Sequence, residues 1–370
     1  DYFFLGKYRV LLTANQEGYV VALIQAAGTI VNMVVSIFLI YIGAGVLFVK
    51  AVATGVYMLR LVLVKIYAKR KYPALDFHAE PNEGALKQKN AALLHQVVGI
   101  IVNNTDTTVL TICLGAKSLL EVSVYGIYMM VVNAVNQLMT SFSNGLTAGF
   151  GEVIAKNEEE TLKKSYSSYE YMYFVIMFIV IACMGVLILP FVGVYTINLT
   201  DVQYVRPVLG ILFTLIVFMQ NVRIPGLTII CAAGHYKETR YQAILEAVIN
   251  ITVSLGLVWK FGMAGVLLGT VCSYGYRSFE IVFYTSRHLV KGCAKKSMFR
   301  ILRNVFTVAI LCTVGTYVIP QEITSFTTWF LYAIGMGLTS VFLVVVINYV
   351  VEPDEFMQLR HRVNDIIKKE

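Results

Sequence analysis

The segment from His95 to Gly115 reads HQVVGIIVNNTDTTVLTICLG, and it decides how the rest of the chain is interpreted. It is long enough to cross a bilayer. Near its middle it carries four polar residues, Asn103, Asn104, Thr105 and Asp106. A lone carboxylate at the centre of a lipid-facing helix costs about 3 kcal/mol or more, so such groups face a bundle interior or a water-filled cavity and mark transport paths. Asp106 is therefore a candidate functional residue.

The composition of the whole chain agrees with a membrane environment. Hydrophobic residues make up 58% and charged residues only 14%, and the mean hydropathy is +0.70. Continuous apolar runs favour helices over barrel strands, in which apolar and polar residues alternate. We therefore expect an all-α polytopic membrane protein. The predicted spans are 20–42, 44–64, 93–114, 122–148, 170–190, 205–231, 241–259, 263–284, 300–319 and 326–351, after a partial helix at 1–14.

The connecting segments alternate in charge. Most Lys and Arg residues lie in 65–92, 149–169, 232–240, 285–303 and 352–370, whereas the other side holds Lys117, Arg206 and Lys260. The positive-inside rule places the first set, with the C-terminus, in the cytoplasm. These basic segments set the topology and contact anionic lipid headgroups, which explains the net charge of +8 without nucleic-acid binding.

An internal repeat indicates how the helices are grouped. Gly45-Val46-Leu47 and Gly55 align without gaps on Gly265-Val266-Leu267 and Gly275, and corresponding loops fall on the same membrane side. This pattern predicts a parallel repeat. Three helices and most of a fourth are then expected before Asp1. The predicted divisions are 1–64 as the C-terminal part of the first six-helix lobe, 65–92 as a cytoplasmic linker, 93–290 as the second lobe, 291–351 as two terminal helices and 352–370 as a cytoplasmic tail.

Motifs of ATP-driven or hydrolytic enzymes are not found in the sequence. It has no Walker loop, dinucleotide fingerprint or nucleophile elbow, and its Cys and His residues lack metal-ligand spacing. We expect no enzymatic activity, no metal and no organic cofactor.

Local strings resemble a known family of transporters. They are Leu11-Leu12-Thr13-Ala14-Asn15-Gln16, Asn104-Thr105-Asp106, Val122-Ser123-Val124-Tyr125-Gly126-Ile127-Tyr128 and Ala232-Ala233-Gly234-His235-Tyr236-Lys237-Glu238-Thr239. With the two-lobe pattern, they make the chain similar to the multidrug/oligosaccharidyl-lipid/polysaccharide exporter superfamily, which is MATE-like, and within it to the Wzx-type polysaccharide flippases.

This resemblance implies a specific function and location. The fold would have six plus six plus two helices when complete. The substrate would be an undecaprenyl-pyrophosphate-linked oligosaccharide, moved across the bacterial cytoplasmic membrane by alternating access for surface polysaccharide synthesis. Membrane lipids and the polysaccharide polymerase machinery are the implied partners.

Such a substrate requires inward-facing cations. Arginine grips phosphate through a bidentate fork, whereas lysine acts as a point charge. The candidates within spans are Arg277, Arg223, Lys50 and Arg60. The alternative for Arg277 and Arg223 is an internal salt bridge with Glu246 or Glu280. For Arg60 and Lys50 it is snorkelling to the headgroups.

The acidic residues within spans suggest coupling to H⁺ or Na⁺. Asp106 is the main candidate, because desolvation brings carboxylates into a range where they bind protons near neutral pH. Its neighbours Asn103, Asn104 and Thr105 offer neutral oxygens suitable for sodium, and Glu246 is a second acidic candidate. The alternative for each is a structural bond between helices.

Further polar residues are candidates for sugar contact. Asn133, Asn136 and Gln137 lie on one helical face that Thr140 and Asn144 continue, and this stripe either lines a cavity or joins helices. Tyr125 and Tyr128 either stack on sugar or belong to the interfacial aromatic belt.

Two other functions remain open. A cation-coupled multidrug antiporter of the MATE type needs a cavity dominated by carboxylates and aromatics, but cations outnumber acids in these spans. A membrane glycan polymerase needs a long outer loop with acidic catalytic groups, and the longest outer loop here, at about 191–205, is short.

Overall fold

The computed structural model describes residues 2–15, 17–73, 75, 88–143, 146–320 and 323–357, with side chains from residue 6 onward. The chain divides into two compact units, Asp1–Leu86 and Lys87–Glu370. This boundary lies inside the predicted linker 65–92. Residues 76–87 of that linker, residues 358–370 of the tail, Gln16 and Asn144 lie outside the described residues.

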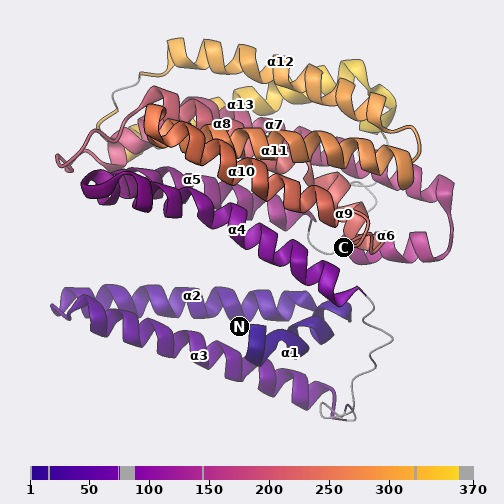
Figure 1. Cartoon of the computed structure of the whole chain (residues 1–370), viewed down its shortest axis with the longest axis horizontal. Coiled ribbons are helices and arrows are strands. Elements are labelled where there is room, and N and C mark those ends of the chain that lie inside the picture. Colours follow the sequence, from indigo (N-terminus) through magenta and orange to yellow (C-terminus); the bar gives the residue numbers. More distant parts are fainter. Residues whose placement is uncertain are drawn as a thin grey trace. The chain divides into compact units, whose positions relative to one another are not determined.

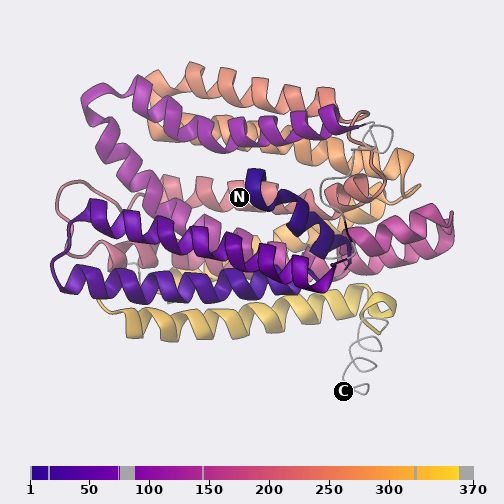
Figure 2. The same ribbon diagram turned by 90° about the horizontal axis from the view of Figure 1, so that it is seen from below.

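The first unit consists of three helices, α1 (Tyr2–Ala14), α2 (Gly18–Tyr41) and α3 (Val46–Lys71). Figures 1 and 2 show α2 and α3 side by side along most of their length. Its small core joins Tyr8 and Leu12 of α1 to Val64 and Ala68 of α3. Helix α3 continues beyond the predicted span end at residue 64, because its last, basic turns extend past the apolar stretch.

The second unit is also helical. It begins with α4 (Lys89–Cys113), η2 (Gly115–Lys117), α5 (Ser118–Ser143), α6 (Leu146–Ala155) and α7 (Glu159–Tyr195). It continues with α8 (Pro207–Val222), α9 (Ile224–Ala232), α10 (Arg240–Phe261), α11 (Met263–His288), α12 (Ala294–Val318) and α13 (Phe326–Val351). Eight helical segments in the described part of the chain are long and apolar enough to cross a membrane. The predicted all-α, polytopic membrane architecture is therefore confirmed. The other two predicted spans, 93–114 and 263–284, form α4 and α11, which are not among these eight segments.

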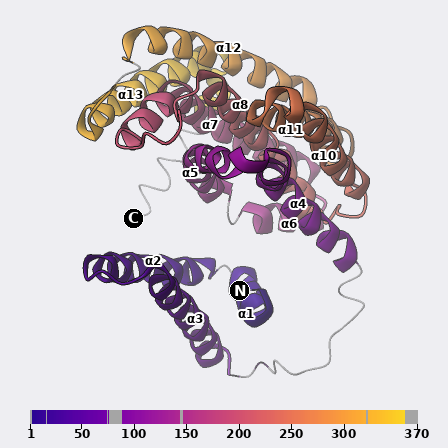
Figure 3. The same cartoon turned by 60° about the vertical axis from the view of Figure 1, so that its left-hand side comes forward.

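Helix α7 forms the centre of the second unit. Its 37 residues carry a continuous set of buried apolar side chains, among them Phe174, Met177, Phe178 and Ile181. In Figure 3, α12 and α13 lie on one side of this unit and α10 and α11 on the other, with α7 and α8 between them. The terminal helix pair therefore packs directly on the second lobe.

The hairpin of α10 and α11 shows why glycine is needed at particular positions. Gly262 joins the two helices at φ 56°, a left-handed conformation that favours glycine. A Cβ at Gly269 would lie 2.7 Å from the backbone nitrogen of Ser254, and one at Gly265 would overlap the carbonyl of Leu257. Gly45, which aligns with Gly265, precedes α3 in the hairpin of α2 and α3, whereas Gly265 itself lies in the first turn of α11.

Candidate functional site

Asp106 lies in the interior of the second unit, where α4, α5, α10 and α11 meet. Only 4% of its surface is exposed. Its carboxylate accepts hydrogen bonds from Thr270 Oγ1 at 2.7 Å and from Tyr125 Oη at 3.3 Å. Asn250 of α10 extends this group by donating to Thr270 Oγ1 at 3.0 Å. The buried carboxylate therefore joins three neighbouring helices through neutral donors.

The three residues before Asp106 do not share its environment. Thr105 donates to the carbonyl of Ile101 at 2.7 Å within α4, and Asn104 is exposed. Asn103 accepts a hydrogen bond from Tyr274 Oη of α11 at 3.2 Å. The expected ring of oxygens around Asp106 is thus not formed by these three residues, because successive helical positions point in different directions.

A cluster of four charged residues lies near the Asp106 group. Arg223 Nη1 is 2.5 Å from Glu246 Oε1, and Arg277 Nε is 3.6 Å from Glu246 Oε2. Arg277 also pairs with Glu280 one turn along α11. Arg277 is only 3% exposed. We call Arg223, Glu246, Arg277 and Glu280 the ionic cluster. Its contacts match the internal salt bridges that were the alternative interpretation of these arginines.

Tyr274 connects the ionic cluster to helix α4. The guanidinium of Arg223 lies 4.4 Å from the centre of the Tyr274 ring, and the same tyrosine donates to Asn103. Thr270, Tyr274 and Arg277 lie on one face of α11, at i, i+4 and i+7. Thr270 and Tyr274 were not among the predicted site residues, although this polar stripe in the sequence is the signal that identifies them.

The ionic cluster coincides with a break in the backbone. The predicted span 205–231 is divided into α8 and α9, with Arg223 between them. Pro225 has no N–H and cannot continue the hydrogen-bond ladder of α8, so the helix is interrupted here. The backbone N–H of Arg223 bonds to the carbonyl of Asn221 instead. Arg223 therefore occupies a position where two helical segments can change their relative angle.

The polar stripe of α5 is divided between two roles. Asn136 donates to Gln220 Oε1 at 2.9 Å and accepts from Asn221 Nδ2 at 2.9 Å, so it joins α5 to α8. Asn133, Gln137 and Thr140 are exposed. We call these three side chains the polar face of α5. Asn136 is thus a helix-joining residue, whereas its neighbours remain available to a cavity.

The two candidate tyrosines lie in the core rather than on a surface. Tyr128 is fully buried, stacks on Phe213 with ring centres 5.0 Å apart, and donates to the carbonyl of Tyr204 at 3.1 Å. Tyr125 packs against the same phenylalanine and donates to Asp106. Neither ring is accessible for sugar stacking or for the interfacial belt in this unit, because Tyr125 is only 5% exposed and Tyr128 is fully buried.

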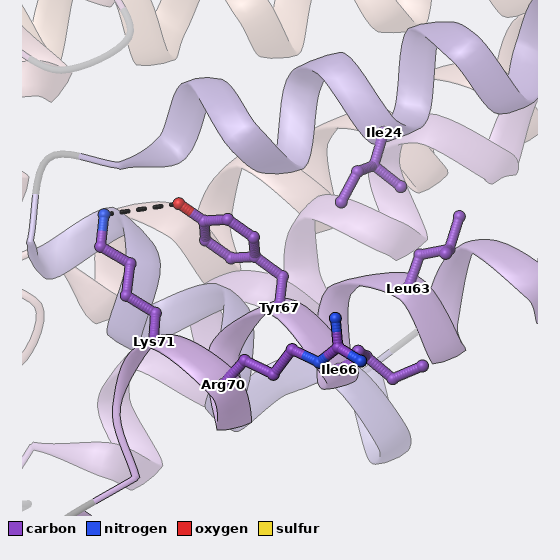
Figure 4. Close-up of a pocket in the computed structure, with 6 residues that line it drawn as sticks. All are labelled: Ile24, Leu63, Ile66, Tyr67, Arg70 and Lys71. Atoms are coloured by element: carbon purple, nitrogen blue, oxygen red, sulfur yellow. Dashed lines mark hydrogen bonds between the residues drawn. The ribbon is translucent and has the colours of Figure 1, made fainter.

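The first unit holds the two other predicted phosphate ligands. Lys50 is exposed, whereas Arg60 is only 8% exposed and lies against Gly28 of α2. Arg60 therefore does not snorkel to the surface of its unit. Figure 4 shows a groove on the same helix pair with a volume of about 460 Å³. It is lined by Ile24, Leu63, Ile66, Tyr67, Arg70 and Lys71.

A second buried charge cluster was not predicted. Arg300 of α12, 1% exposed, lies 3.0 Å from Glu170 Oε2 of α7 and 3.0 Å from Glu352 Oε1, directly after α13. Glu355 accepts from Lys296 Nζ and Ser167 Oγ, each at 2.6 Å. Burial opposes ionisation of Glu355, but these two hydrogen bonds, together with the positive charges of Lys296 and Arg300, outweigh it and lower its pKa below the usual range. In the sequence, Arg300 belongs to the basic segment 285–303 and was predicted only to set the topology.

Across the described ranges, no three His, Cys, Asp or Glu side chains gather where they would hold a metal ion. No protein-family model matches the chain, and no curated protein matches it. The resemblance to polysaccharide flippases therefore stays a prediction from the sequence strings.

Proposed function

We propose that this chain is part of a membrane transporter that moves an anionic lipid-linked oligosaccharide, of the undecaprenyl-pyrophosphate class, across the bacterial cytoplasmic membrane by alternating access. The observation that carries the proposal is the polar face of α5. It lies in the middle of a membrane-spanning helix and is exposed on the second unit.

Lipid contact would be unfavourable for this face. Neither Asn133 nor Gln137 has a side-chain hydrogen bond within the described residues, and amides without partners in hydrocarbon cost several kcal/mol. Water or a polar ligand supplies the missing partners. Each amide carries both donors and acceptors, which suits the hydroxyl groups of a glycan.

The ionic cluster supports alternating access. Its two arginines pair with its two glutamates, and it lies at the break between α8 and α9. An anionic headgroup that attracts Arg223 would compete with Glu246 and favour a different angle at that break. The transporter thus has a local element with two arrangements.

Cysteine accessibility tests the hydrated path directly. The six native cysteines are replaced, and Asn133→Cys and Gln137→Cys are compared with Phe342→Cys on α13, where the native side chain is 65% exposed in an apolar surface. A membrane-impermeant thiol reagent should modify the first two in intact membranes and spare the third. Equal protection of all three would contradict a water-filled path along α5.

The substrate class needs a separate measurement. Proteoliposomes are loaded with a fluorescent lipid-linked oligosaccharide, and its appearance in the outer leaflet is followed with a membrane-impermeant quencher. We expect transfer that requires the pyrophosphate. If the cysteine test shows a hydrated α5 face but the lipid-linked oligosaccharide is not transferred, the protein transports another substrate.

A cation-coupled multidrug antiporter is the second candidate, because Asp106 is a buried carboxylate bonded only to neutral donors. Asp106→Asn keeps the size of the side chain and removes its charge. If an ion gradient drives transport through Asp106, this variant loses the gradient dependence. Efflux of a cationic dye, in the absence of glycan transfer, would favour the antiporter.

A further inference from the structure

Arg60 is buried in the first unit and has no counter-ion among the residues that the structure describes. Its Nε and Nη2 atoms are buried and have no hydrogen-bond partner. Its guanidinium lies 4.0 Å from the centre of the Tyr57 ring, which is on the same helix and is 53% exposed. A cation–π contact offsets only part of the desolvation penalty of a buried charge.

The other buried arginines differ from Arg60 in this respect. Arg277 pairs with Glu280 and Glu246, and Arg300 pairs with Glu170 and Glu352. The only Asp or Glu residue between positions 2 and 75 is Glu17. Its carboxylate lies 2.5 Å from Lys71 Nζ. The described part of the first unit therefore has no free carboxylate to neutralise Arg60.

Gly28 makes the space that Arg60 occupies. A Cβ added at Gly28 would lie 2.5 Å from Arg60 Nε and 2.6 Å from its Cδ. Any other residue at position 28 would thus move the side chain of Arg60. Because Gly28 has no side chain, Arg60 fits closely against α2. This close fit holds the guanidinium in one place, as a preorganised binding group requires.

The groove in Figure 4 provides an approach to this region. Leu63 and Ile24, two of its lining residues, lie one helical turn from Arg60 on α3 and from Gly28 on α2, respectively. Arg70, near the basic end of α3, is exposed and forms no ion pair among the described residues. An anionic head entering from that end would meet Arg70 first.

We propose that Arg60 is a phosphate-binding residue, held by Gly28 and Tyr57, and that it rather than Arg277 contacts the phosphate of the transported lipid. This inference rests on the proposed function for the identity of the substrate. A guanidinium one helical turn inside the end of the predicted span 44–64, with N–H groups that lack hydrogen-bond partners, offers two parallel donors to phosphate oxygens. The neutralised arginines of the ionic cluster offer no comparable excess charge.

A fluorescent reporter beside Arg60 tests phosphate binding without a transport assay. The two native tryptophans, Trp259 and Trp329, are replaced by Phe, and Tyr57→Trp places an indole under the guanidinium. The full chain in detergent micelles is titrated with phosphatidic acid, with phosphatidylcholine and with inorganic pyrophosphate. We expect saturable changes in emission with phosphatidic acid and none with phosphatidylcholine. A response to pyrophosphate as strong as that to phosphatidic acid would assign a soluble phosphate as the ligand.

Variants in this reporter background identify the binding residue. Arg60→Gln should weaken phosphatidic acid binding by roughly tenfold or more, and Gly28→Ala should weaken it by displacing the guanidinium. Lys65→Gln removes an exposed charge from the same helix and is the matched control, with little expected effect. Unchanged binding in Arg60→Gln, or a loss confined to Arg277→Gln, would overturn the inference.

The two proposals fail in different ways. If proteoliposomes transfer the lipid-linked oligosaccharide but Arg60→Gln transfers and binds normally, the transport function stands and the role of Arg60 is wrong. If no transfer occurs but phosphatidic acid binding depends on Arg60, the binding site stands and the transport function is wrong.

Discussion

Replacement of Arg300 by glutamine should destabilise the second unit strongly. Arg300 donates to Glu170 Oε2 at 3.0 Å, to Glu352 Oε1 at 3.0 Å and to the carbonyl of Ser167 at 3.0 Å. Without it, the carboxylate of Glu170, 2% exposed, keeps hydrogen bonds from Ser297 and Tyr166 but loses its counter-ion. Breaking a buried pair in this way costs about 3–5 kcal/mol.

A partly exposed ion pair in the same unit provides the matched control. Arg206 makes two hydrogen bonds to Glu121, at 2.8 and 2.9 Å, but their side chains are 28% and 20% exposed. Solvent screens this pair, so Arg206→Gln should cost only about 1 kcal/mol. Both variants remove one arginine that bonds two carboxylate oxygens or more. The difference between them reflects burial together with the larger number of partners of Arg300.

The assay is denaturant unfolding of purified protein in detergent micelles, followed by far-UV circular dichroism. Adding Glu170→Gln to Arg300→Gln should recover part of the loss, because a neutral amide needs no counter-ion. The reasoning is refuted if Arg300→Gln is no less stable than Arg206→Gln. It is also refuted if Glu170→Gln lowers the free energy of unfolding of the Arg300→Gln variant by as much as it lowers that of the wild type.

Three further predictions concern pH, packing and the helix break. Glu355 has a lowered pKa in the folded protein, so its contribution to stability is present above the usual pKa of glutamate and disappears as the pH falls through the lower value. The difference in melting temperature between wild type and Glu355→Gln should therefore shrink on acidification from about pH 6 to below about pH 4. Gly269→Ala should cost roughly 1–3 kcal/mol by overlap with Ser254. Gly275→Ala on the same helix, where a Cβ meets nothing within 4 Å, should be neutral or slightly stabilising in the same unfolding assay. Pro225→Ala should restore the hydrogen-bond ladder between α8 and α9, and should slow glycan transfer in proteoliposomes while leaving the melting temperature equal or higher. Faster transfer would argue against a hinge at this position.

The helices themselves were largely predictable. The predicted span 326–351 matches α13, and the predicted start of α11 at residue 263 is the observed one. Hydropathy measures how much chain fits in hydrocarbon, so it places spans well but misses helical turns that extend into water. This is why α3 continues to Lys71 and α7 begins at Glu159. The break at Arg223 was not predicted, although Pro225, two residues later, is a signal in the sequence for a helix interruption.

The partners of the polar groups were less predictable. Arg277 and Glu280 are one turn apart in the sequence, so their pairing was among the alternatives considered. Arg300 and Glu170 come from different helices far apart in the chain, and no local pattern indicates that they meet. Asn133 and Asn136 also look equivalent in the sequence. Only the position of α8 distinguishes them, because Gln220 and Asn221 reach Asn136.

The sequence by itself determined that this is an all-α membrane protein and which residues are polar within its spans. Both follow from local properties, namely the apolar length needed to cross a bilayer and the cost of polar groups in hydrocarbon. The tertiary structure decided which charges are neutralised, which amides remain exposed and which buried arginine has no carboxylate partner among the described residues. Those outcomes depend on contacts between helices distant in the chain. They direct attention from Arg277, paired with two glutamates, to Arg60, which has none.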